Sequence, residues 1–249
     1  MSYAYVPDEE NGLGSALFDK SGPSIEFAEQ EVRLGLCARF LVRLLTVQLA
    51  ITAGVTALFI GSPSVKAYVY SNQWTFWAAF GTSLGLVLLL SCWEQARRQH
   101  PLNLVFLFAF TACEAVLVGT ISSMYNTDIV LIAALLTVGM TLCLSLYALQ
   151  TKRDFTAAGG IMFSLLFALI GAGILSMFIR NRVLDIVVSG VGAALFGCYI
   201  VFDVQMMVGS GSYAISPDEY VLAAINIYLD IVNLFLYLLR LLQEIQGNN

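Results

Sequence analysis

Seven long apolar segments, separated by short polar breaks, constrain what this chain of 249 residues can fold into. A helix that crosses the hydrocarbon core of a bilayer needs roughly 20 consecutive apolar residues. The segments reach that length, and they lack the alternation of apolar and polar residues that marks a membrane β-barrel strand. The sequence therefore predicts an all-α, polytopic membrane protein that spans the bilayer at residues 38–60, 74–93, 102–122, 129–149, 157–179, 185–207 and 219–242.

The composition also indicates a membrane protein. Hydrophobic residues make up 59% of the chain and charged residues 12%, whereas a soluble domain carries about 25% charged residues. The apolar segments make the lipid bilayer the expected partner. The net charge of −5, which comes partly from the polar amino-terminal segment, gives no indication of a nucleic acid. The five cysteines lack CxxC spacing and lie in or beside the spans, so we expect buried packing residues and no disulfide or metal site.

The first 36 residues differ from the rest of the chain because they are polar, acidic and rich in glycine and proline. They lack the cationic start and short apolar core of a secretory signal, and they are not arginine-rich as a mitochondrial transit peptide is. The sequence therefore predicts a flexible acidic tail at 1–36 and a seven-helix transmembrane domain at 37–249.

Lysine and arginine are distributed unequally between the two sides of the predicted membrane. Eight lie on the side of the amino terminus and three on the other, which by the positive-inside rule places the tail in the cytosol. The eight are Lys20, Arg33, Arg39, Arg43, Arg97, Arg98, Lys152 and Arg153, and the three are Lys66, Arg180 and Arg182. The last segment either crosses the membrane completely or dips in and returns to the cytosolic side.

Three acidic residues, Glu114, Asp203 and Asp230, lie inside the predicted spans. A carboxylate in hydrocarbon is costly, so it must face a partner or a water-filled cavity. Asp203 and Asp230 occupy the last two segments, whose connection is long enough to let them meet. Two carboxyl groups about 3 Å apart share a proton, which makes the pair a candidate proton sensor or gate. The structural alternative is a salt bridge with Arg43 or Arg240, or a neutral acid hydrogen-bonded to the backbone.

Polar residues also form lines along single helices. In the last segment Asn226, Asp230, Asn233 and Tyr237 share one helical face, which must point into the protein because lipid cannot satisfy it. Together with Glu114, the two asparagines are candidates for lining an ion pathway. Rows of threonine and glutamine in other spans, such as Gln48, Thr52 and Thr56, either join helices or line a polar cavity.

The residues just described carry a resemblance to a known family. Residues 100–156, the segment FGCYIVFDVQMM at 196–207 and the segment YLDIVNLFL at 228–236 resemble the transmembrane Bax-inhibitor-motif family, in particular its lifeguard branch. The similarity covers about 33–242, and its most specific motifs are YLDIVNLFL and the loop QTKRDFT at 150–156. The resemblance implies a bundle in which six spans surround the last one.

The resemblance also implies a function and its residues. Family members are associated with calcium leak from internal stores, with pH dependence and with protection against cell death. An acid pair from the last two segments serves as pH sensor and gate, and its positions match Asp203 and Asp230; the acid of the third span matches Glu114. The family's usual Tyr-Asp-Thr-Gln is Phe-Asp-Val-Gln here, at 202–205, so the side chains next to Asp203 differ.

We therefore expect a pH-sensitive calcium leak channel of the endoplasmic reticulum or Golgi, with the mitochondrial inner membrane as the alternative location. Calcium prefers oxygen ligands, which Asp203, Asp230, Asn226 and Asn233 could supply, and no cofactor is expected. The alternative function is a non-conducting structural or regulatory membrane subunit that acts through protein partners. An enzyme is not expected, because the buried acids come without a nucleophile and base or a set of metal ligands.

Overall fold

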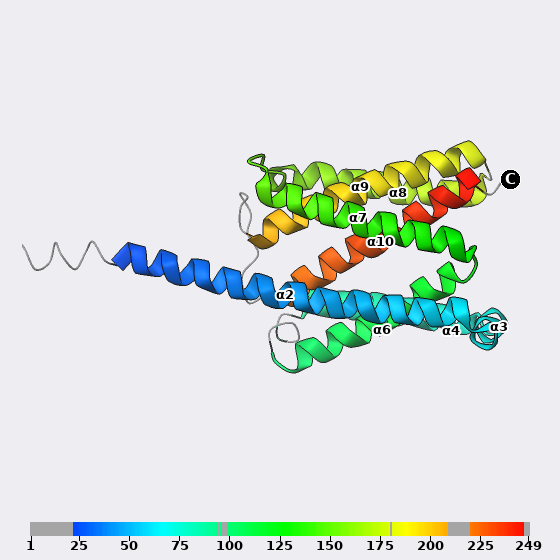
Figure 1. The fold of residues 1–249 in the computed structure, drawn as a ribbon, viewed down its shortest axis with the longest axis horizontal. Coiled ribbons are helices and arrows are strands. Elements are labelled where there is room, and N and C mark those ends of the chain that lie inside the picture. The colour runs from blue at the N-terminus through cyan, green and yellow to red at the C-terminus, as the bar shows by residue number, and fades with distance from the viewer. Residues whose placement is uncertain (1–21, 94, 96–98, 180, 209–219, 247–249) are drawn as a thin grey trace, which may run out of the picture.

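A computed structural model of the chain describes residues 22–93, 95, 99–179, 181–208 and 220–246, and the side chains from residue 39 onward. All regular elements in these residues are helical (Figure 1). They are α2 (Gly22–Gly61), α3 (Pro63–Ser71), α4 (Trp74–Cys92), α6 (Leu102–Ser122), α7 (Thr127–Gln150), a 3-10 turn (Thr156–Ala158), α8 (Gly159–Phe178), α9 (Arg182–Val208) and α10 (Tyr220–Gln246).

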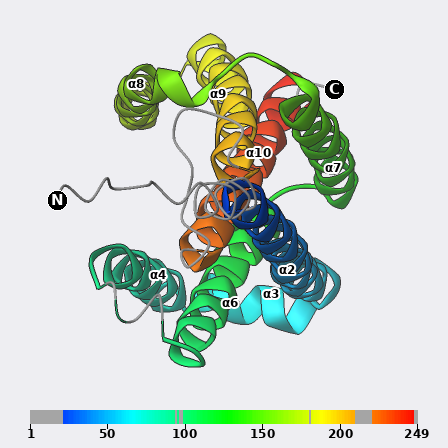
Figure 2. The same cartoon turned by 90° about the vertical axis from the view of Figure 1, so that its left-hand side faces the viewer.

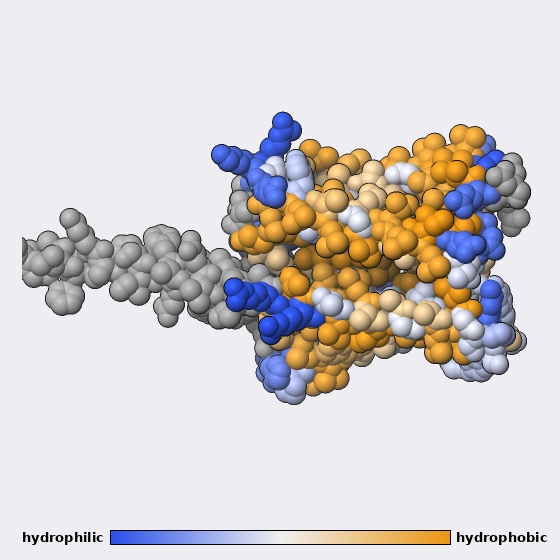
Figure 3. All heavy atoms as spheres, in the orientation of Figure 1, coloured by the Kyte–Doolittle hydropathy of each residue, from blue (hydrophilic) through white to orange (hydrophobic). Residues whose placement is uncertain are grey.

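Seven of these helices are long and apolar enough to cross a membrane, which confirms the predicted fold class. Their apolar parts begin and end within a few residues of the predicted spans, and the face shown in Figure 3 carries a broad hydrophobic belt between hydrophilic ends. Helix α2 begins at Gly22, inside the segment that the sequence assigns to the tail. Residues 1–21 lie outside the described part of the chain, so the flexible tail stays a prediction.

Helix α10 is the most interior of the seven spans. Buried residues make up 61% of its apolar stretch and at most 44% of that of any other span. It packs against α9, α7, α2 and α6, while α4 packs mainly on α6 and α8 mainly on α9 (Figure 2). A complete ring of six helices around α10 stays a prediction.

The last helix crosses the whole bundle without a break. Its 27 residues span about 40 Å, which exceeds the roughly 30 Å of bilayer hydrocarbon. It begins at the end of the bundle where α2 begins and finishes beside the α8–α9 turn at the opposite end (Figure 1). The length and continuity of α10 favour the fully spanning topology over the re-entrant one, and the choice between them stays a prediction.

Small residues let α9 approach its neighbours closely. A Cβ atom at Gly192 would lie 2.5 Å from Cδ1 of Tyr237 on α10, and one at Gly197 would lie 3.2 Å from Cδ1 of Leu144 on α7. The ring of Tyr237 also stacks on Phe196, with 5.6 Å between ring centroids. The close contact between the last two helices therefore depends on the absence of a side chain at Gly192.

The expectation that the cysteines are buried is wrong for Cys92, Cys143 and Cys198, which are exposed. The physical reason is that lipid tails are as apolar as protein interiors, so a hydrophobic residue gains little by turning inward in a membrane. Exposed leucine, valine and phenylalanine residues surround these cysteines for the same reason.

The substitution Gly192→Ala should therefore weaken the α9–α10 contact. Its methyl group would displace the Tyr237 ring, and we expect a loss of about 1–3 kcal/mol in the free energy of unfolding. Unfolding in mixed micelles with increasing SDS measures this loss. Gly190→Ala on the same helix is the matched control, because a Cβ there meets no atom within 4 Å. Equal effects of the two substitutions would contradict the packing role of Gly192.

Candidate functional site

The carboxyl groups of Asp203 and Asp230 lie against each other between α9 and α10. Both residues are only 6% exposed, and their side chains are within hydrogen-bonding contact. Asp203 lies near the end of α9 and Asp230 in the first half of α10, so the pair is nearer to the end of the bundle where α2 begins. The structure thus brings together the two acids that the sequence singled out.

A contact between two carboxyl groups has a definite chemical requirement. A hydrogen bond between them needs a proton on at least one, because two carboxylates repel each other at this distance. Oδ2 of Asp230 is buried and meets no hydrogen-bond partner among the described residues, so a full negative charge there would be poorly solvated. The arrangement therefore favours a pair that holds a shared proton.

Tyr199 is a neighbour of the pair. It lies half-buried one helical turn before Asp203 and is close enough to both acids to interact with their charges. Phe202 packs edge-on against Tyr199, with 6.3 Å between ring centroids. Neither Phe202 nor Val204 can donate a side-chain hydrogen bond to Asp203. These two neighbours of Asp203 therefore add no side-chain hydrogen bond to its carboxyl group.

Gln205 fastens this end of α9 to the α7–α8 connection, a role that sequence reasoning missed. Its Oε1 accepts the backbone N–H of Phe155 at 2.9 Å, and its Nε2 donates to the carbonyl of Arg153 at 2.9 Å. Asp154 accepts hydrogen bonds from the N–H and hydroxyl of Thr156 at 2.9 and 2.5 Å, which starts the turn into α8. The loop QTKRDFT and Gln205, the last residue of the segment Phe-Asp-Val-Gln, therefore meet here.

Glu114 is not part of the aspartate cluster. It is half-buried on α6, accepts a hydrogen bond from Ser83 on α4, and lies close enough to Tyr228 for its charge to act there. Tyr228 and Asp230 are two residues apart, which places them on opposite sides of α10. Glu114 and the aspartate pair therefore flank α10 from different directions.

Polar side chains join α10 to α2 and α6 on that second side. Gln48 donates to Thr111 at 2.9 Å, and Thr52 and the hydroxyl of Tyr228 are 2.8 Å apart. These contacts correspond to the interpretation of the Gln–Thr row as a joint between helices. All four residues are buried, so each bond satisfies polar atoms that lipid could not. Oε1 of Gln48 and Oγ1 of Thr56 are buried as well, and neither has a hydrogen-bond partner among the described residues.

The two asparagines and the expected calcium ligands have no closed site around them. Asn226 is half-buried, and Asn233 donates from Nδ2 to the carbonyl of Leu229 on its own helix at 2.8 Å. Within the described residues no three His, Cys, Asp or Glu side chains gather where they could hold a metal ion. Asp203 and Asp230 would therefore offer a passing cation two carboxyl groups, well short of the 6–8 oxygens of a tight calcium site.

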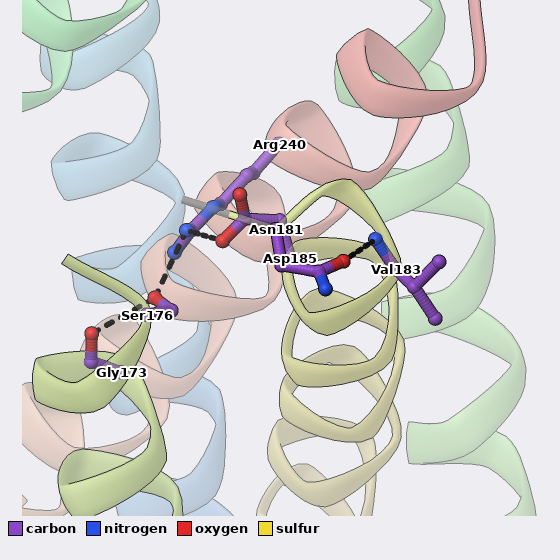
Figure 4. Close-up of polar contacts among 6 residues, drawn as sticks. All are labelled: Gly173, Ser176, Asn181, Val183, Asp185 and Arg240. Carbon is purple, nitrogen blue, oxygen red and sulfur yellow. Dashed lines mark hydrogen bonds and ion pairs between the residues drawn. The ribbon is translucent and has the colours of Figure 1, made fainter. Parts of the chain in front are cut away.

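Arg240, considered above as a partner for the aspartate pair, lies at the other end of the bundle. Its Nη2 is 2.5 Å from Oδ1 of Asp185 on α9 and donates to Oγ of Ser176 on α8 at 3.1 Å (Figure 4). Arg43 is exposed, and no ion pair joins it to either aspartate in the described part of the chain. The salt-bridge alternative for Asp203 and Asp230 is therefore wrong, because neither arginine reaches them.

The neighbouring α8–α9 turn is bonded to the end of α10 as well. The guanidinium of Arg182 donates from Nε and Nη2 to the carbonyl of Glu244, at 3.0 and 2.7 Å. The side chain of Asn181 accepts the N–H of Val183 at 2.9 Å and thereby starts α9 (Figure 4). Sequence reasoning missed Asp185 as the partner of Arg240. The sequence did offer one indication, because Asp185 lies in the first turn of α9, at the same end of the bundle as Arg240.

Comparison with known proteins identifies related sequences. A family model described as inhibitor of apoptosis-promoting Bax1 matches residues 42–248. The chain is 35% identical over 222 residues to the Golgi anti-apoptotic proteins of Vaccinia virus strains Lister and LC16m8. Each alignment covers 89% of this chain and 90% of the viral protein.

The Arg240–Asp185 pair allows a direct test of what holds the far end of α10. The two side chains are 33% and 18% exposed, so solvent screens the pair, and we expect Arg240→Gln or Asp185→Asn each to cost about 1 kcal/mol in unfolding free energy. In SDS unfolding the double variant should cost little more than either single one, because both remove the same contact. Arg43→Gln, at an exposed arginine, is the control. Strictly additive losses would show that the two residues act independently.

Proposed function

The chain belongs to the family of inhibitors of apoptosis-promoting Bax1, and we propose that it suppresses cell death from an intracellular membrane as a pH-sensitive calcium leak channel. The family membership and the anti-apoptotic, Golgi-named viral relatives support the first part of the proposal and the Golgi as the location, ahead of the endoplasmic reticulum or the mitochondrial inner membrane. The choice of calcium as the transported ion rests on the resemblance to the family.

The observation that carries the gating part of the proposal is the buried contact between Asp203 and Asp230. With one proton between them, the two carboxyl groups hold α9 against α10 near the predicted cytosolic end. With both ionised, two negative charges face each other, no cation within the described part of the chain forms an ion pair with them, and they repel. Loss of the proton therefore favours separation of the two helices, and low pH favours the closed bundle.

The remaining acidic and amide residues support a path for cations. Asn226 and Asn233 lie one turn to either side of Asp230 on α10, so an ion that passes between α9 and α10 would meet oxygen atoms in succession. Glu114 lies on the other side of α10, where it accepts a hydrogen bond from Ser83 and its charge acts on Tyr228. Arg240 is held by Asp185 at the far end, so its charge does not stand unpaired in the proposed route.

One observation favours the alternative, a non-conducting subunit that acts through protein partners. The polar side chains between α2, α6 and α10 bond each other at 2.8–2.9 Å, as they would in a bundle that needs them only for cohesion. In that case the protein would protect cells through its partners, and purified protein would pass no ions.

The decisive measurement is calcium flux into liposomes that contain the purified protein, followed between about pH 6 and pH 8. For the wild-type chain we expect flux to rise with pH. Asp230→Asn should give low flux at every pH, because its amide donates permanently to Asp203 in place of the shared proton. Asp128→Asn, at an exposed acid in the first turn of α7, is the matched control and should behave like the wild type.

Two outcomes would contradict the proposal in different ways. Flux with an unchanged pH profile in Asp230→Asn would remove the aspartate pair from the gate but leave a channel. No flux from well-folded wild-type protein, together with retained protection of cells against death, would establish the non-conducting alternative.

A further inference from the structure

An apolar groove of about 350 Å³ runs between α7 and α9 on the outside of the bundle. Its lining includes Leu144, Tyr147, Phe155, Ala194, Cys198 and Val201. Ala194 and Cys198 are exposed and lie in the middle of a membrane span, so the groove faces lipid hydrocarbon. A second apolar groove, of about 480 Å³ between α8 and α9, shares these two residues and continues the apolar surface.

Aromatic and basic residues mark one end of the groove. Tyr147 and Phe155 meet edge-on there, with 6.1 Å between ring centroids, at the level where α7 ends. Lys152 and Arg153 follow in the α7–α8 connection and are both exposed. Rings at the headgroup level with basic residues just beyond them are the arrangement by which membrane proteins hold anionic lipid headgroups.

The connection that carries the two cations is fixed in place. Gln205 on α9 binds the carbonyl of Arg153 and the N–H of Phe155, so the basic residues and the aromatic mouth move with α9. Asp154, the acid next to them in the sequence, accepts hydrogen bonds from Thr156 at the start of the turn into α8. The backbone of Arg153, one of the two basic residues, is therefore held in place against α9.

We propose that this groove and the basic pair bind one anionic phospholipid of the cytosolic leaflet. One acyl chain would lie in the groove between α7 and α9, and the phosphate and acidic headgroup would face Lys152 and Arg153. The orientation that the positive-inside rule gives this chain puts the basic pair on the cytosolic side, where anionic lipids are enriched. The proposal concerns a site outside the aspartate pair and does not depend on ion conduction.

The experiment compares lipid retention by the purified full-length protein in native mass spectrometry. The probes are dioleoyl phosphatidylserine and dioleoyl phosphatidylcholine, which share their chains and differ in headgroup charge. We expect the wild type to retain phosphatidylserine preferentially. Lys152→Gln with Arg153→Gln should lower that preference by about fivefold per charge, roughly 30-fold in total.

Matched variants separate the two parts of the site. Arg39→Gln with Arg43→Gln removes the same charge from exposed residues of α2 and should leave the preference unchanged. Cys198→Phe fills the groove and should weaken retention of both lipids, whereas Cys143→Phe, at an exposed cysteine of α7 outside the groove lining, should not.

The results can overturn the proposal at each step. Equal retention of the two lipids by the wild type would refute a specific headgroup site. An equal loss from the α2 double variant would mean diffuse attraction to a basic surface. Displacement of phosphatidylserine by millimolar inorganic phosphate would show an anion site that needs no acyl chain.

Discussion

The contact between the carboxyl groups of Asp203 and Asp230 lies where α9 meets α10, the most buried span of this protein. A buried acid in a membrane protein needs a partner, each of these two has the other, and a hydrogen bond between them requires a proton on one. The interface that they occupy is also the one where Gly192 admits the ring of Tyr237. Close packing at Gly192 and the contact between the two acids therefore join α9 and α10 at two different levels along their length.

Helix α10 is held at two points along its length by contacts of different chemistry. In its first half Asp230 meets another carboxyl group, Asp203, whereas near its end Arg240 forms an ion pair with the opposite charge of Asp185. The carbonyl of Glu244 adds two further hydrogen bonds from Arg182 at that end. The first attachment joins two acids and the second joins opposite charges.

The fold was largely predictable from the sequence because each span must be apolar over a length that the bilayer fixes. The meeting of Asp203 and Asp230 was predictable as well, since a buried acid requires a partner and these two lie on consecutive spans. The partner of Arg240 was not, because a sequence does not give the depth at which a long side chain ends. Nor was the position of Glu114, since the rotation of α6 about its axis depends on packing. The exposed cysteines show the same limit: hydrophobicity does not distinguish the lipid face from the core in a membrane.

Because Tyr228 and Asp230 project to opposite sides of α10, the two sides of the helix cannot change independently. Within the proposed mechanism, repulsion at the aspartate pair moves the first half of α10 away from α9 and toward α2 and α6. There it meets the contact between Thr52 and Tyr228 and the packing of Tyr228 on Phe110, with 5.9 Å between ring centroids. The ion pair at the far end then acts as the pivot, so the displacement is greatest near the predicted cytosolic end, where α9 and the α7–α8 connection are joined by Gln205. A proton lost between two side chains is in this way converted into a movement of one end of a single helix.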